Sequence, residues 1–187
     1  MTGLPIQPID EELQTLQREV QRMLGRCLLR LQQYEQLMKA IVAHHEISAS
    51  GSPLESNQAE RIADAANKTL GTLVGTLLGT YVTSGDQDEV AEPDAPDNII
   101  SFKMKMSLRM SAADFDTTQN DLKELVLLRN NLVHHFIDQH DLWSLDGCRG
   151  AQESLVAAYS RVDQHFEQLR GWAEHMDQAR RLAAELA

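Results

Sequence analysis

The sequence predicts an all-α protein, an up-down bundle of four long helices with one short strand-like segment near residues 99–110. Three observations support this prediction. Apolar residues recur at helical spacing along most of the chain, Leu, Ala and Gln are abundant, and aromatic residues make up only 5% of the sequence. Good helix formers therefore outnumber the residues that strands favour. At 187 residues the chain has the length of one domain with a real core, and we expect a single domain over 1–187.

The chain is acidic, and its negative charge is concentrated in one segment. It has 17 Lys and Arg against 28 Asp and Glu, which makes a formal net charge of −11. Residues 84–98 contain six acidic residues, two prolines and no basic residue, which predicts an acidic flexible connector. The net charge argues against a protein that coats nucleic acid indiscriminately, but it leaves room for a local RNA site.

Neither a membrane protein nor a disulfide-rich secreted protein is expected. The sequence has no run of about 18 apolar residues, and its first residues lack the basic and apolar regions of a secretory signal. Cys27 and Cys148 lack the spacing of a disulfide framework or a zinc site. We therefore expect a cytoplasmic protein.

The first helix is expected from about Ile9 to Ile47. Acidic residues occupy its first turn, where negative charge suits the helix dipole. Its apolar residues follow one another at steps of three and four, which is typical of a helix with one buried face. They are Leu13, Leu16, Val20, Met23, Cys27, Leu31, Tyr34, Met38 and Ile41. A helix of this length needs other long helices, or a second chain, to cover that face.

A ladder of four arginines lies largely opposite this apolar face. Arg18, Arg22, Arg26 and Arg30 are spaced by four residues and therefore line up along the helix. A solvated face is the simpler interpretation of the ladder. The sharper interpretation is a track for an RNA backbone, with Arg18, Arg22 and Arg26 as candidate RNA contacts.

Turn-forming residues at 48–53 are expected to follow the first helix, and a second helix is expected over 56–82. Gly71, Gly75 and Gly79 lie four residues apart in it and therefore share one face. Because each glycine costs a helix about 1 kcal/mol relative to alanine, three at this spacing predict that another helix approaches closely there.

Apolar and polar residues alternate over 100–110, a period of two that is typical of a half-buried strand. A lone strand leaves its backbone groups unpaired. Its partner is expected either near Tyr81–Ser84 or in the same segment of a second subunit. The segment carries Lys103, Lys105 and Arg109 and no acid, so Lys103 and Lys105 are further candidate RNA contacts.

A third helix is expected from Ser111 or Asp114 to about Gln139. A fourth is expected from Asp146 or Gly147 to the end of the chain. Helical spacing of apolar residues continues in the fourth helix almost to the last residue. This leaves open whether the chain is a piece of a longer protein.

The third helix contains the residues with the clearest chemical potential. On a helical wheel, Arg129 falls in the middle of an apolar face, and Asn130 and His134 share one edge of that face because they are four residues apart. A buried guanidinium cannot lose its charge, so it needs a carboxylate from another helix or a bound phosphate. The residues assigned to the apolar face are Leu122, Leu125, Val126, Val133, Phe136 and Ile137.

The pattern Arg129-Asn130-x-x-x-His134 resembles the signature of the HEPN superfamily, in which an arginine and a polar residue precede a histidine by a few positions. The resemblance implies an all-α bundle that dimerises so that two copies of the motif face one cleft. It also implies cleavage of RNA by attack of the ribose 2′-OH on the neighbouring phosphate, without a metal or another cofactor.

The resemblance also implies a role for each motif residue. His134 would be the general acid or base, Arg129 would hold the scissile phosphate and stabilise its transition state, and Asn130 would orient the phosphate or the histidine. We expect such a homodimeric endoribonuclease to act as a toxin or defence effector. Its expected partners are RNA, a second copy of itself, and an antitoxin or regulatory protein.

A second hypothesis makes the chain a non-catalytic helical module that dimerises and binds RNA or a partner protein. Arg129 would then be a buried structural cation paired with an acid such as Asp64 or Glu35. Segments Leu24–Arg30 and Leu169–Glu174 resemble the helical region that precedes RNA-binding OST-HTH/LOTUS modules in some bacterial proteins. The chain has no room for such a module itself.

Other histidines near the motif suggest a metal site only weakly. His134 and His135 point about 100° apart on a helix, so we interpret their proximity to His140 and Asp138 as chance. Asp138 follows His134 by four residues and is either an acid that orients the imidazole or a solvated carboxylate.

Overall fold

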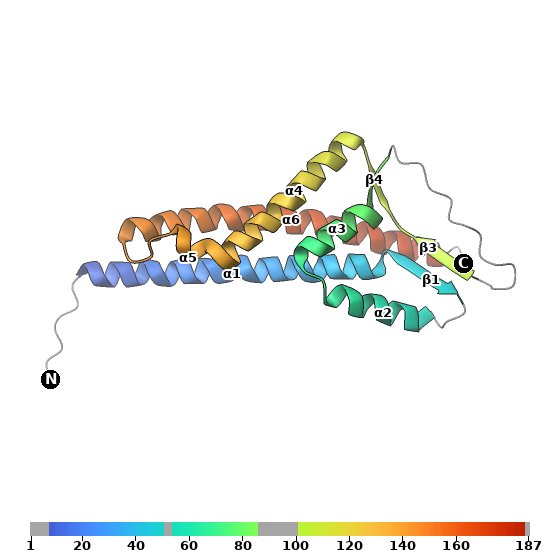
Figure 1. The fold of residues 1–187 in the computed structure, drawn as a ribbon, viewed down its shortest axis with the longest axis horizontal. Coiled ribbons are helices and arrows are strands. Elements are labelled where there is room, and N and C mark those ends of the chain that lie inside the picture. The colour runs from blue at the N-terminus through green and yellow to red at the C-terminus, as the bar shows by residue number, and fades with distance from the viewer. Residues whose placement is uncertain (1–7, 51–53, 86–100, 186–187) are drawn as a thin grey trace. The chain divides into compact units, whose positions relative to one another are not determined.

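The computed structural model describes residues 8–50, 54–85 and 101–185, and the predicted acidic connector lies largely outside them (Figure 1). Helices dominate these residues, which confirms the all-α class. The helices and strands in chain order are α1 (Pro8–His44), β1 (Glu46–Ser50), α2 (Leu54–Ala66), α3 (Leu70–Thr80), β2 (Val82–Ser84), β3 (Ser101–Lys105), β4 (Leu108–Met110), α4 (Ala112–Asn130), a π-helical turn (Asn131–His135), α5 (Phe136–Gln139) and α6 (Leu145–Glu185).

The described residues divide into two compact units. The first comprises residues 8–33 and 125–166, and the second comprises the described parts of 34–124 and 167–187. In the first unit the early parts of α1 and α6 run parallel (Figure 1), since Glu12 pairs with Arg149 and the Cys27 thiol lies 3.5 Å from the carbonyl oxygen of Leu155. Both helices bury their apolar stripes there, which forms the core of this unit.

The second unit holds two small sheets. β1 pairs antiparallel with β3, and β2 pairs parallel with β4. The predicted strand is therefore confirmed as β3 and β4, with a short break between them. The expected partner near Tyr81–Ser84 is confirmed for β4 alone, as β2, whereas β3 pairs with β1, which was not predicted. The Tyr81 hydroxyl donates a hydrogen bond to the carbonyl of Trp172 on α6, at 3.2 Å, within this unit's core.

Residues 46–50 form a strand, so the prediction of a helix up to Ile47 followed by a turn is wrong. The helix ends at His44 because His45 satisfies one of its last carbonyls. Its ring nitrogen Nδ1 lies 2.9 Å from the carbonyl oxygen of Val42. The following backbone then pairs with β3, which supplies the hydrogen bonds that this strand requires.

The second predicted helix is two helices, α2 and α3, rather than one. Thr69 starts α3 as its N-cap, since its side chain accepts a hydrogen bond from the amide of Thr72. The predicted close approach at the glycine face is wrong for Gly75 and Gly79. Both are exposed, and a Cβ added at either would meet no heavy atom within 4 Å.

Among the residues that the structure describes, none of the helices is apolar over enough of its length to cross a membrane.

The acid stability of the second unit is expected to depend on His45. This side chain is 3% exposed and lies edge-on to Tyr81, and its Nε2 atom has no hydrogen-bond partner among the described residues. Burial lowers the pKa of His45 from 6.5, because the charged imidazolium loses its hydration. The unfolded state therefore binds the proton first as the pH falls, and folding stability is lost below about pH 6.5.

We predict that His45→Phe flattens the decline in the free energy of unfolding below pH 6.5 by up to about 1.4 kcal/mol per pH unit. Chemical denaturation at several pH values measures this slope. His135→Phe, at an exposed histidine, is the matched control and should keep the wild-type slope. Equal slopes in all three proteins would show that His45 does not control acid stability.

Candidate functional site

The structure brings the guanidinium and the imidazole of the motif together through a π-helical turn. Arg129 lies in the last turn of α4, and His134 lies in the π-turn Asn131–His135 that follows it. On a regular α-helix, residues five apart point about 140° away from each other. The π-turn bonds residue i to residue i+5 and so brings such residues onto one side of the helix.

The motif side chains form a chain of hydrogen bonds. Nη1 of Arg129 donates to Oδ1 of Asn130 at 3.2 Å and lies 3.4 Å from Nε2 of His134. Because a guanidinium has only donors, the second contact requires Nε2 to be the unprotonated nitrogen. The motif thus places a permanent cation beside an imidazole, and the lone pair on the unprotonated Nε2 accepts a hydrogen bond from that cation.

The predicted apolar face is partly wrong. Leu122, Leu125 and Phe136 are buried as expected, but Val133 and Ile137 are 45% and 74% exposed, and Leu132 is buried instead at 6%. The interpretation placed Arg129 in the middle of a buried face, whereas the structure leaves it half-buried and His134 exposed. The guanidinium is therefore accessible to an anion from solvent.

The carboxylates proposed as structural partners of Arg129 have other partners. Asp64 pairs with Lys68 at 2.7 Å, and Glu35 pairs with Lys39 at 2.9 Å. Within the described part of the chain, neither an ion pair to Arg129 nor a hydrogen bond from the His134 ring to the Asp138 carboxylate is found. The hypothesis that Arg129 is a buried, salt-bridged structural cation therefore gains no support from these acids.

The arginine ladder on α1 is used differently along its length. Arg18 is exposed, and Arg22 pairs with Glu19 at 2.7 Å. The guanidinium of Arg26 lies 4.7 Å from the centre of the Tyr159 ring and contacts the sulfur of Met23. Arg18 and Arg22 therefore do not contact α6 in this way, whereas the guanidinium of Arg26 packs against it.

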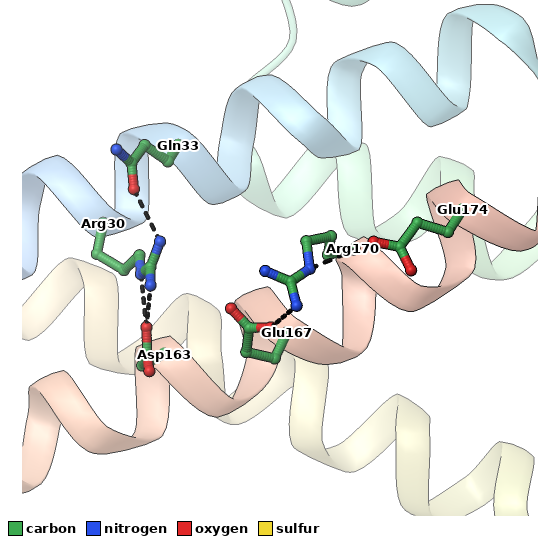
Figure 2. Close-up of polar contacts among 6 residues, drawn as sticks. All are labelled: Arg30, Gln33, Asp163, Glu167, Arg170 and Glu174. Atoms are coloured by element: carbon green, nitrogen blue, oxygen red, sulfur yellow. Dashed lines mark hydrogen bonds and ion pairs between the residues drawn. The ribbon is translucent and has the colours of Figure 1, made fainter. Parts of the chain in front are cut away.

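Arg30 is the most engaged residue of the ladder. It pairs with Asp163 and donates to Gln33 at 3.0 Å (Figure 2). Its guanidinium also covers the ring of Phe166. The same figure shows Arg170, in the second unit, flanked along α6 by Glu167 and Glu174. Its ion pairs with these two acids measure 2.5 and 3.5 Å. Arginine alone thus does not mark an anion site here, since nearby acids neutralise both residues.

The lysines proposed as RNA contacts lie on the short sheet of the second unit. In β3, Lys103 is paired in register with Ser48, and Lys105 with Glu46. Lys105 is exposed, and Glu46 forms an ion pair with Arg61 at 3.3 Å. These lysines and the motif belong to different units, so the structure does not place them on one surface.

A groove in the first unit was not predicted from the sequence. Most of its lining residues follow the motif directly in the chain. It encloses about 560 Å³ and includes Trp143, which is 83% exposed, although apolar burial is the usual fate of such a side chain. Its lining residues are Gln17, Gln21, Ile137, Asp138, Gln139, His140, Asp141, Leu142 and Trp143. The sequence feature that could have indicated the groove is Trp143, because it lies in a turn-forming segment outside the apolar faces of the predicted helices.

No group of three or more histidine, cysteine or acidic side chains in the described residues is arranged to hold a metal ion. Both cysteines are buried and unpaired with each other, and burial raises the pKa of each thiol. Comparison of the chain with models of protein families, with curated proteins and with solved structures finds no match in any of the three.

The burial pattern around the π-turn leads to a stability prediction. Leu132→Ala should reduce the free energy of unfolding by about 2–4 kcal/mol because it empties a buried position. Val133→Ala, one residue further, should cost less than about 1 kcal/mol, since that side chain is largely exposed. Chemical denaturation measures both losses. A larger loss for Val133→Ala than for Leu132→Ala would contradict the π-turn, because it would indicate a regular α-helix with Val133 buried.

The contact between Arg129 and His134 leads to a spectroscopic prediction. In the neutral form of the His134 ring, its ¹⁵N chemical shifts should report the tautomer with an unprotonated Nε2 and a protonated Nδ1. Arg129→Ala should remove this preference, because no donor then faces Nε2. His135 serves as the control within the same spectra, and a protonated Nε2 in the wild-type protein would contradict the contact.

Proposed function

We propose that the chain is a metal-independent endoribonuclease of the HEPN type, which cleaves RNA by attack of a ribose 2′-OH on the adjacent phosphate. The observation that carries this proposal is the 3.4 Å contact between Arg129 Nη1 and His134 Nε2. This reaction requires stabilisation of the charge on a phosphate and transfer of a proton. A guanidinium beside an imidazole provides one group for each requirement.

The proposed reaction uses each motif residue once. The RNA phosphate takes the place of Nε2 as acceptor of the Arg129 donor, because a charged acceptor makes the stronger hydrogen bond. The released Nε2 of His134 can then accept the proton of the 2′-OH. Attack of the 2′ oxygen on phosphorus forms a 2′,3′-cyclic phosphate and breaks the bond to the 5′ oxygen. That oxygen takes up a proton from water or, in the dimer proposed below, from a second, protonated histidine. Asn130 keeps the guanidinium in position through its amide oxygen.

We propose further that the active form is a homodimer in which the helices of the chain form an up-down bundle and two motifs share one cleft. A second histidine would then supply the proton to the leaving oxygen while the first acts as base. The role as a toxin or defence effector, and an antitoxin or regulatory partner, belong to the same proposal.

A second candidate function is a helical module that binds RNA or a partner protein without cleaving it. One observation favours it. Among the described residues no carboxylate is hydrogen-bonded to His134, whereas an acid-base histidine is commonly oriented by a third group. In that case Arg129 and the exposed Arg18 would bind phosphate, and the histidine would be dispensable.

Incubation of the purified chain with single-stranded RNA in EDTA tests both candidates. We expect cleavage that leaves 2′,3′-cyclic phosphate ends, reduced about 10²–10⁴-fold by His134→Ala and about 10²–10³-fold by Arg129→Ala. Arg129→Lys should also be impaired, because lysine cannot reproduce the planar donor pair.

His135→Ala is the matched control for this experiment. It removes the neighbouring exposed histidine, whose ring lies 6.2 Å from that of His134, and should keep wild-type cleavage. Undiminished cleavage in His134→Ala would rule out the nuclease assignment to this motif. Binding of RNA without any cleavage by the wild-type chain would favour the non-catalytic module.

A further inference from the structure

The groove after the motif presents a tryptophan to solvent from a backbone that is held in place. The side chain of Gln17 on α1 donates to the carbonyl of Leu142 at 2.8 Å. The amide of Trp143 itself donates to Oδ1 of Asp141 at 3.1 Å. These bonds fix the loop before α6 at two consecutive residues, so the exposed indole belongs to an ordered segment.

Gly147 shows how closely this loop packs against the start of α6. A Cβ added there would lie 1.9 Å from the carbonyl oxygen of Asp141, so only glycine fits. Ser144 completes the arrangement as its hydroxyl accepts a hydrogen bond from the amide of Gly147 at 3.1 Å. Because the backbone of the loop is already fixed, only the two side-chain torsions of an aromatic residue need to be ordered when a flat ligand stacks on its ring.

The groove lies next to the motif. Ile137 and Asp138 line it and follow His134 by three and four residues, which is about one turn of helix or 5 Å. Ile137 is 74% exposed and, with Trp143, adds apolar surface to the groove. A ligand that occupies the groove therefore lies within about one helical turn of His134 along the chain.

The polar groups of the groove select what can occupy it. Asp138 and Asp141 both line it, and Arg129 is not among its lining residues. Two carboxylates repel a phosphate but accept hydrogen bonds from the edge of a nucleobase. Guanine offers two adjacent donors, N1–H and the N2 amino group, which match the two oxygens of one carboxylate. Uracil instead presents carbonyl oxygens on both sides of its single donor.

We propose that this groove is a base subsite of the nuclease: a guanine next to the scissile phosphate stacks on Trp143 and donates to the carboxylate of Asp138. The proposal rests on the proposed function for its RNA context, and it adds the base preference of the same site. Asp141 already accepts from the amide of Trp143. No hydrogen bond or ion pair to Asp138 is found among the described residues, so both of its oxygens are available to the base. Stacking alone contributes about 1–3 kcal/mol per base.

Titration of the ¹⁵N-labelled wild-type chain with guanosine monophosphate tests the subsite. The sequence contains two tryptophans, so two indole N–H signals are expected. The Trp143 signal, assigned by its loss in Trp143→Leu, should shift saturably. The signal of Trp172, which is 9% exposed, is the internal control and should not move. Uridine monophosphate should bind at least about tenfold more weakly.

Two variants distinguish a specific role of the Asp138 carboxylate from the effect of removing one negative charge. Asp138→Asn should weaken the binding of guanosine monophosphate about tenfold or more, because a hydrogen bond to a charged group is lost. Asp146→Asn removes an exposed acid that does not line the groove and should bind like the wild type. Equal shifts with both nucleotides, equal loss in both variants, or no shift of Trp143 would overturn the proposal.

The titration does not depend on RNA cleavage, so the two proposals can fail separately. A selective Trp143 shift without any cleavage of RNA would support the base subsite while removing the nuclease. Cleavage of RNA without a nucleotide-dependent Trp143 shift would overturn the subsite alone. A Trp143 shift that follows protein concentration in the absence of nucleotide would assign the groove to a second copy of the chain, and would also overturn the proposal.

Discussion

The contact between Arg129 and His134 depends on one turn of π-helix at the end of α4. That turn converts a spacing of five residues, which a regular helix would direct to different faces, into a contact between Arg129 and His134. A π-turn forms at the expense of regular hydrogen bonding, and such turns are frequent at functional sites. Burial of Leu132 within the turn and of Phe136 directly after it stabilises the turn.

Hydrophobic periodicity predicts the parts of this fold that are long and regular. The stripe of α1 and the alternation over β3 and β4 have periods of 3.6 and two that no other structure would satisfy. The strand β1 could not be predicted in this way, because Ser48, Ala49 and Ser50 have turn-like composition and form a strand only by pairing with β3. Local composition was overridden there by the hydrogen-bonding needs of a distant segment.

The candidate site was predictable as a set of residues but not as a geometry. Arg129, Asn130 and His134 can be selected from the sequence, whereas a wheel of constant pitch places the Arg129 and His134 side chains apart and turns Val133 inward. The groove beside Trp143 was not predictable, because it depends on a hydrogen bond from Gln17, which is distant in sequence. Periodicity carries no information about such contacts.

A double-mutant cycle on RNA cleavage measures the coupling of Arg129 and His134 most directly. Two residues that act on the same phosphate and proton as a unit should be strongly non-additive. We expect the chain carrying both Arg129→Ala and His134→Ala to cleave no more slowly than the slower of the two single variants. A double variant whose loss equals the product of the two single losses would contradict the account, because the residues would then act independently.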